Sequence, residues 1–152
     1  MISVVLAEPN QEIATHIEQL ISESADISLH SKAHELDSLK SSTGTSDWNL
    51  CLVSLAYPYD SIKEFIISAN LARPDGKILL LSDRSDNEQI LDFLSLGASG
   101  FVEYADVDRF IIKAISKAWE GEAWIPRSMV KLILDRLTWL NGVSGANSTK
   151  VQ

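Results

Sequence analysis

The sequence predicts a doubly wound α/β fold, in which five parallel strands form one sheet and helices cover both of its faces. Short apolar runs of strand length alternate five times with segments whose apolar residues recur every three or four positions, the spacing of one helix face. Because crossovers between parallel strands are right-handed, five such units most simply give the strand order 2-1-3-4-5. Apolar residues after position 120 predict one extra C-terminal helix.

The clearest strand lies in the stretch Asn49–Pro58. A mostly apolar run leads into Ser54, and Pro58 follows four residues later. An unbroken apolar run bounded by turn formers is typical of a strand buried on both faces. In parallel α/β sheets, functional residues lie just outside the carboxyl ends of the strands. A functional residue is therefore expected at Ser54, where the sequence carries a neutral hydroxyl.

The N-terminal part of the chain supplies two further strands. The apolar run Ile2–Ala7 predicts the first strand, which Glu8-Pro9-Asn10 ends. Ile27–Ser31 predicts the second, Leu36 and Leu39 lie in a weak helix, and the polar segment Ser41–Asp47 predicts a loop. The helix between these strands carries one apolar stripe, formed by Ile13, Ile17, Leu20 and Ile21.

The second half of the chain continues the alternation. Lys77–Ser82 and Gly100–Tyr104 predict the fourth and fifth strands. Gly97 is expected to end the fourth helix, and Asp106 is a suitable N-cap for the fifth. The turn Arg73–Gly76 follows the third helix. The apolar stripes of the third, fourth and fifth helices consist of Ile62, Phe65, Ile66 and Ala69, of Ile90, Leu91 and Leu94, and of Phe110, Ile111, Ala114, Ile115 and Ala118.

The segment after residue 120 predicts an appended helix and a tail. Pro126 suits a first helical position, and the helix that follows carries Met129, Ile133, Leu137 and Leu140. Residues 141–152 are rich in Gly, Ser, Asn and Thr, which indicates a flexible tail or linker. The predicted organisation is a domain over residues 1–120, a linker helix over 121–140 and a tail over 141–152.

Composition limits the classes of function. The chain has 13 Lys and Arg against 21 Asp and Glu, so its formal charge is 13 − 21 = −8. An acidic chain repels phosphate backbones, which makes direct nucleic-acid binding by this segment unexpected. The single Cys51 lies mid-strand and forms no internal disulfide, which fits a reducing cytoplasm. We expect neither a signal peptide nor a membrane span, because the N-terminus enters a strand directly and no apolar run reaches about 18 residues.

The five-unit order and the phrase Leu96-Gly-Ala-Ser-Gly-Phe101 resemble the receiver domain of two-component response regulators, which has the flavodoxin-like (CheY-like) fold. The resemblance covers about residues 2–120. Gly121–Pro126 is similar to the start of the linker helix in the NarL/FixJ-type subfamily. The resemblance implies a cytoplasmic protein of phosphorelay signal transduction that regulates transcription.

A working receiver has an acidic pair that holds Mg²⁺, an Asp that takes the phosphoryl group, a Ser or Thr, and a Lys, each after a different strand. By resemblance these positions hold Glu8 with Pro9, Ser54, Ser82 and Tyr104. Two spacings fix the register, because Ser54 lies four residues before Pro58 and Tyr104 four after Gly100, as in the family. The resemblance therefore implies a degenerate phosphorylation pocket in an atypical pseudo-receiver, without the phosphoacceptor Asp, a metal or another cofactor.

Several side chains have two interpretations. Glu8 could ligate a metal, or it could be a half-exposed acid near a helix start. Ser54 could be a nucleophile, but no histidine lies near it in sequence. Cys51 is expected in the core, and the three histidines are expected at the surface: His16, His30 and His34.

Five aromatic residues are candidates for a contact surface. By resemblance, Phe101 takes the aromatic switch position, and it would lie close to Phe110 and Tyr104 on the face of helices four and five. These residues either pack in the core and at its rim or contact a partner. Trp119 and Trp124 either mark an interface or fix the appended helix to the domain.

Three functions follow from these observations. The first is a non-catalytic signalling module that acts by protein contact, as a homodimer or with another protein, through helices four to six. If the natural chain is longer, a helix-turn-helix DNA-binding output domain would follow it. The second is a small-molecule sensor or enzyme whose neutral pocket is lined by Glu8, Ser54, Ser82 and Tyr104, although no phosphate-binding glycine motif is present. The third is a conventional phosphorylated response regulator.

Overall fold

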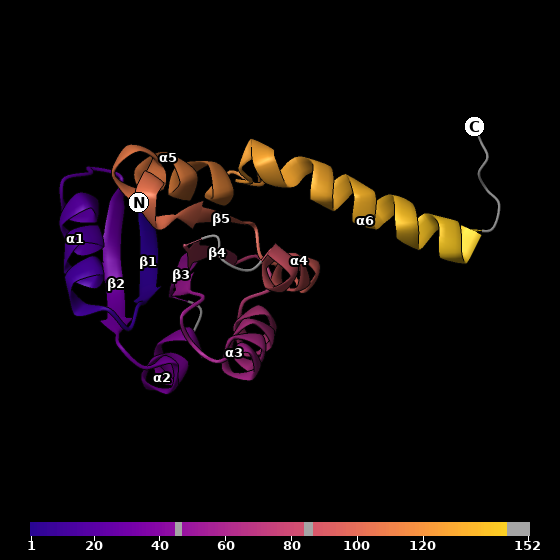
Figure 1. Cartoon of the computed structure of the whole chain (residues 1–152). Coiled ribbons are helices and arrows are strands. Elements are labelled where there is room, and N and C mark those ends of the chain that lie inside the picture. Colours follow the sequence, from indigo (N-terminus) through magenta and orange to yellow (C-terminus); the bar gives the residue numbers. More distant parts are fainter. Residues whose placement is uncertain (45–46, 84–86, 146–152) are drawn as a thin grey trace.

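The computed structural model describes residues 1–44, 47–83 and 87–145. Its sheet has the order β2-β1-β3-β4-β5, and every neighbouring pair of strands is parallel (Figure 1). The predicted fold class is therefore confirmed. The strands are β1 Ile2–Ala7, β2 Ile27–Ala33, β3 Leu50–Ser54, β4 Lys77–Ser82 and β5 Gly100–Glu103. The α-helices are α1 Gln11–Ser22, α2 Lys40–Thr43, α3 Tyr59–Ala72, α4 Asn87–Ser95, α5 Val107–Trp119 and α6 Arg127–Gly145.

The helices form a layer on each face of the sheet, with α1 and α5 on one side and α2, α3 and α4 on the other (Figure 1). The central strand β3 is buried along its whole length and contributes side chains to the core on both faces of the sheet. Cys51 and Val53 pack in the core beneath α3 and α4, whereas Leu50 and Leu52 pack against α1 and α5. This two-sided burial explains why the strand is an uninterrupted apolar run, and it confirms the core position of Cys51.

Several boundaries differ from the predicted ones. β2 continues two residues past Ser31, and β5 ends at Glu103, so that Tyr104 begins a 3₁₀ turn, Tyr104–Asp106. A second 3₁₀ turn, Leu36–Leu39, leads directly into α2, which occupies the start of the expected loop; residues 45–46 of that loop lie outside the described residues. Asp106 takes the N-cap position of α5 as expected, but its side chain makes no capping hydrogen bond.

The appended segment is held against β5 by its backbone. Phe101 donates its N–H to the carbonyl of Trp124 at 2.9 Å, and Trp124 donates to the carbonyl of Ser99 at 3.0 Å. The contact is so close that a Cβ atom on Gly100 would lie 2.0 Å from the carbonyl oxygen of Trp124, and Gly100 also has a φ of +151°. Only glycine fits this position without strain.

α6 begins one residue after Pro126, so this proline lies just before the helix rather than at its first position. The helix runs past α4 and extends away from the sheet (Figure 1). It continues to Gly145, five residues beyond the predicted end, and residues 146–152 of the predicted tail lie outside the described residues. Within the described ranges, no helix is both long and apolar enough to cross a membrane.

Candidate functional site

Three polar side chains meet where the carboxyl ends of β1, β3 and β5 come together. Glu8 follows β1, Ser54 ends β3 and Tyr104 follows β5. The hydroxyl oxygen of Tyr104 lies 2.6 Å from Ser54 Oγ and 2.8 Å from Glu8 Oε1. The strand order makes this possible, because β3 lies beside β1 and the tyrosine reaches the site from beyond β4. The predicted pocket residues Glu8, Ser54 and Tyr104 are thus close together.

The hydrogen bonds of this cluster have a definite direction. An ionised carboxylate only accepts, so Tyr104 donates its proton to Glu8 Oε1. The Tyr104 oxygen then accepts from Ser54, whose Oγ accepts in turn from the N–H of Ala56 at 3.0 Å. The result is a chain from Ala56 through Ser54 and Tyr104 to Glu8, in which each hydroxyl both donates and accepts.

Glu8 is buried, with 1% of its surface exposed, which corrects its interpretation as a half-exposed loop acid. Burial raises the pKa of Glu8, while hydrogen bonds from the N–H of Asn10 and from Tyr104 act against that shift. Both carboxylate oxygens therefore have donors inside the protein. The carbonyl of Glu8 also accepts from His34 Nδ1 at 3.2 Å.

Tyr104 keeps its proton. Burial raises the pKa of the Tyr104 hydroxyl, and the neighbouring carboxylate of Glu8 raises it further. A protonated phenol is a poor general base, so Tyr104 does not activate Ser54 as a nucleophile. The three histidines are exposed, as predicted. The three side chains of the cluster are therefore joined by hydrogen bonds, and none of the three histidines lies among them.

Ser82 and Pro9 are the other two residues of the predicted pocket. Ser82 is buried at the end of β4 and lines a small cavity of about 120 Å³ beside Tyr104. Pro9 is exposed and carries no group that could bind a cation. The remaining residues that line the cavity are Leu55, Ala56, Leu81, Asp83 and Gln89.

The residues present do not fit the Mg²⁺ ion that a receiver fold implies. Magnesium requires several oxygen ligands in near-octahedral geometry, usually including one or two carboxylates. At the position of the family's acidic pair, Glu8 supplies one carboxylate, both of whose oxygens accept hydrogen bonds from Tyr104 and Asn10, and Pro9 supplies no ligand. In the described ranges, no group of three His, Cys, Asp or Glu side chains could hold a metal ion.

The aromatic candidates do not share one surface. Phe101 is fully buried in the core beneath α3 and α4, whereas Tyr104 and Trp124 pack against the core on the opposite side of the sheet. The expected group of Phe101, Phe110 and Tyr104 on one face is therefore wrong. Phe110 instead packs its ring against Trp124, with centroids 5.8 Å apart.

Trp124 thus holds the appended segment against the domain, through both its ring and its backbone. Trp119, at the end of α5, is half-buried, with the guanidinium of Arg73 5.8 Å from its ring centroid. These contacts favour the structural interpretation of both tryptophans over the interface interpretation.

Sequence reasoning missed the groups that complete the site. The N–H groups of Ala56 and Asn10 satisfy Ser54 and Glu8, and no side-chain pattern reveals backbone donors. The sequence analysis also considered Tyr104 only as a replacement for the lysine of a working receiver, and not as a hydrogen-bond partner of Glu8 and Ser54. A signal was available, because Glu8, Ser54 and Tyr104 together form a complementary set of one acceptor and two hydroxyls.

Comparison with solved structures finds receiver domains. The isolated receiver domain of RcsB from Salmonella enterica serovar Typhimurium, in the apo form, superposes with a TM-score of 0.77 at 15% identity, covering 88% of this chain and 99% of that one. A LuxR family DNA-binding response regulator from Silicibacter pomeroyi has a TM-score of 0.67 at 20% identity, covering 84% and 99%. A longer Salmonella typhimurium RcsB chain, described for its DNA interaction, has a TM-score of 0.73 at 16% identity, covering 88% and 67%.

No protein-family model matches the sequence, and no curated protein matches it. At identities of 13–20%, the structural likeness establishes the fold, which is that of a response-regulator receiver domain. What the chain does with that fold has to be argued from its own residues.

Proposed function

We propose that the chain is a pseudo-receiver, a regulatory module that signals by protein contact without taking a phosphoryl group. One observation carries the proposal: the hydroxyl of Tyr104 bridges Ser54 and Glu8, at 2.6 and 2.8 Å. This hydrogen-bond chain occupies the place where a working receiver has a free carboxylate, a cation site and a lysine. The proposal includes the degenerate pocket of Glu8, Pro9, Ser54, Ser82 and Tyr104.

The electrostatics of the site support this function. Phosphoryl transfer needs positive charge to neutralise the phosphoryl oxygens. Among the described residues that line the neighbouring cavity there is no Lys, Arg or His. An incoming phosphoryl donor would therefore meet the carboxylate of Glu8 and a serine hydroxyl whose neighbour, Tyr104, keeps its proton.

In this proposal the chain contributes protein contacts to a transcription regulator of the response-regulator kind. Its formal charge of −8 is unfavourable for direct contact with DNA. DNA binding would come from a partner or from a separate output domain, such as a helix-turn-helix domain that follows this segment in a longer natural chain. The module needs no cofactor and catalyses no reaction.

The test is phosphoryl incorporation. The purified chain is incubated with acetyl phosphate and Mg²⁺, and its intact mass is measured at neutral pH before any acid treatment. We expect no mass increase. A stoichiometric gain of one phosphoryl group that maps to Ser54 would overturn the proposal and favour a conventional phosphorylated regulator.

Sensing of a small molecule at the same site has less support. Ligand pockets usually measure about 300–1,000 Å³, and the cavity beside Tyr104 measures about 120 Å³. A thermal-shift screen with metabolites separates the two functions, because a ligand that binds only the native state raises the unfolding midpoint.

A further inference from the structure

α6 carries an apolar stripe that the described part of the domain leaves exposed. Val130, Leu134 and Leu137 are 43%, 57% and 52% exposed, and their spacing of four and three residues places them on one side of the helix. Met129 and Ile133 lie on the adjacent side and pack against the core beneath α4. α6 therefore uses one apolar side for the domain and presents a second to solvent.

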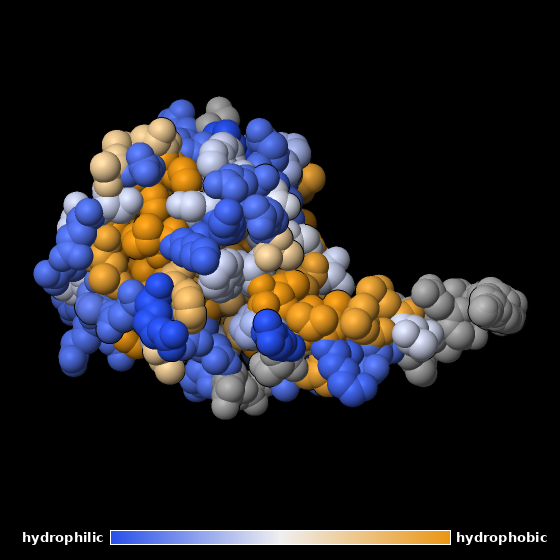
Figure 2. Space-filling model, turned by 90° about the horizontal axis from the view of Figure 1, so that it is seen from above, coloured by the Kyte–Doolittle hydropathy of each residue, from blue (hydrophilic) through white to orange (hydrophobic). Residues whose placement is uncertain are grey.

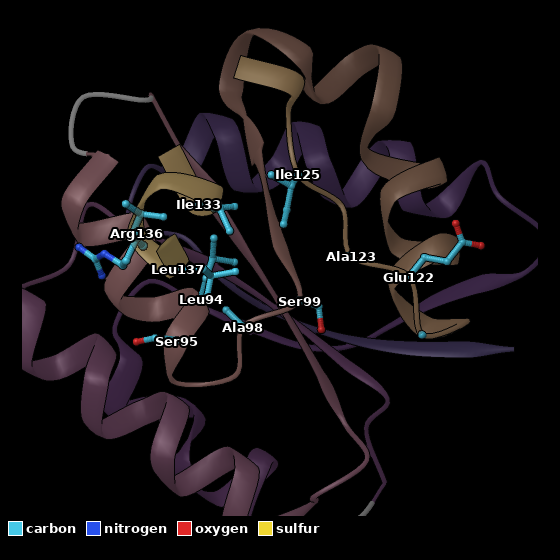
Figure 3. Close-up of a pocket in the computed structure, with 12 residues that line it drawn as sticks. Leu94, Ser95, Ala98, Ser99, Glu122, Ala123, Ile125, Ile133, Arg136 and Leu137 are labelled. Carbon is cyan, nitrogen blue, oxygen red and sulfur yellow. The ribbon is translucent and has the colours of Figure 1, made fainter. Parts of the chain in front are cut away.

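A groove of about 380 Å³ adjoins this stripe. It lies between α4, the start of the appended segment and α6, and its apolar walls include Leu94, Ala98, Ile125 and Ile133 (Figure 3). Leu137 belongs to both features, because it lines the groove and is still half exposed. The apolar surface continues from the domain onto the first half of α6 (Figure 2).

The projecting part of α6 needs a partner for physical reasons. Most helical stability in proteins comes from packing an apolar face, so the part of α6 that projects from the domain gains stability when its apolar side is covered. α6 extends beyond the sheet and the other helices (Figure 1). Contiguous exposed apolar surface of this kind usually marks an interaction site.

We propose that the occupant is a second copy of this chain, whose α6 lies along the stripe and in the groove of the first. The exposed stripe and the groove lie side by side along α6. A two-fold axis near Leu134 would therefore place the stripe of each copy against the stripe and groove of the other. Val130 and Leu137 flank Leu134 at four and three residues, so an antiparallel pair sets Val130 of one copy near Leu137 of the other. The inference deepens the proposed function, since it names the partner of the contact module.

The charges of α6 and α4 favour the seating of the second α6 in the groove, beside α4. α6 contains Arg127, Lys131 and Arg136 against Asp135, a net charge of +3 − 1 = +2, whereas α4 contains two acids and no base, a net −2. The attraction already acts within one chain, where Arg136 contacts Glu88 at 2.6 Å and Asp92 at 3.3 Å. A second α6 seated in the groove lies beside the same acidic helix. Elsewhere the surfaces of two such acidic chains repel each other.

An apolar patch of ordinary size would give a weak dimer. Large apolar patches on monomers measure about 300–600 Å², and closing such a patch against its own copy buries it on both chains. The total of about 600–1,200 Å² is at the low end for specific interfaces. We therefore expect dissociation in the micromolar range, with monomer at high dilution.

Sedimentation velocity on the whole chain, across that concentration range, tests the proposal. The wild-type chain should shift from monomer to dimer as concentration rises. Leu134→Glu should raise the dissociation constant at least about tenfold, because it buries a charge in the contact. The matched control is Leu132→Glu, on the same helix but about 200° away around its axis; Leu132 is 37% exposed, and its variant should dimerise like wild type.

Cysteine cross-linking keeps the test independent of any loss of helix. Leu134→Cys should form a disulfide-linked dimer under mild oxidation, because the axis brings the two copies of this position together, and Leu132→Cys should not. The native Cys51 is buried and does not interfere. A chain that stays monomeric at high concentration, equal effects of the 132 and 134 variants, or a stripe that binds only a different protein would overturn the proposal. None of these outcomes changes the phosphorylation test of the proposed function.

Discussion

The carboxyl end of the sheet and helix α6 differ in whether their side chains have partners within the chain. At the carboxyl end of the sheet, Glu8, Ser54 and Tyr104 satisfy one another in a closed hydrogen-bond chain. On α6, by contrast, Leu134 and Leu137 remain more than half exposed. A satisfied polar cluster gains little from a ligand, whereas uncovered apolar surface gains free energy from any contact that removes water.

The comparison separates fold from function. The receiver topology still brings Glu8, Ser54 and Tyr104 together at the carboxyl end of the sheet, and under the proposed function these residues stabilise the fold and take no part in phosphoryl transfer. We therefore expect changes at the sheet end to alter stability and changes on α6 to alter association.

The largest effect concerns restoration of the phosphoacceptor. Ser54→Asp alone should stay unlabelled by acetyl phosphate and Mg²⁺, because Pro9 supplies no ligand and Tyr104 supplies no positive charge. Loss of one preorganised charge-stabilising group costs about 2.7–4 kcal/mol of barrier, by analogy with a deleted oxyanion donor. The combination of Ser54→Asp, Pro9→Asp and Tyr104→Lys should label better, as measured by intact mass. Full labelling of the single variant would refute the disabling roles of Pro9 and Tyr104.

The second effect concerns the backbone contact between β5 and the segment that leads into α6. Gly100→Ala should destabilise the chain by about 2–4 kcal/mol, because the new Cβ would meet the Trp124 carbonyl at 2.0 Å. Gly121→Ala is the matched control: its φ is +100°, but its Cβ meets nothing within 4 Å. Backbone strain alone should cost it about 1 kcal/mol. Urea unfolding measures both, and equal losses would argue against the close backbone contact.

The third effect concerns the tyrosine bridge. Tyr104→Phe removes the donor to Glu8 and the acceptor for Ser54, so both are left buried without their partner. We expect a loss of about 1–3 kcal/mol in the free energy of unfolding. Tyr57→Phe removes a hydroxyl that bonds an exposed carbonyl, that of His34, and should cost about 0.5–1 kcal/mol. If Tyr104→Phe costs no more than its control, the bridge contributes no net stability.

The smallest effect is a dependence on pH. Burial raises the pKa of Glu8 above its value in the unfolded chain, so the folded state binds the proton more tightly. The stability that this proton confers is present below the unfolded pKa and is lost as the pH rises through the folded pKa. Relative to Glu8→Gln, the wild-type chain should therefore become less stable as the pH rises through this range, by urea unfolding at a series of pH values. An opposite slope would show that the hydrogen bonds to the carboxylate outweigh its burial.

Much of the fold could be predicted from the sequence, because its signals are local. The apolar run Leu50–Val53 indicated a strand buried on both faces, and both cores do meet on it. The spacing of Met129, Ile133 and Leu137 indicated the appended helix. Boundaries were less certain, since the polar composition after residue 140 favoured a tail where α6 continues to Gly145.

The sequence by itself determined the strand order, the element types and the residues that stand at the strand ends, since periodicity and residue type are enough for these. Only the tertiary structure decided that Tyr104 bonds Ser54 and Glu8, which lie 50 and 96 residues away from it. It also decided that Phe101 faces the core and that Leu134 faces solvent. The physical reason is that hydrogen-bond partners and exposed faces depend on how distant elements pack, and no local pattern contains that information.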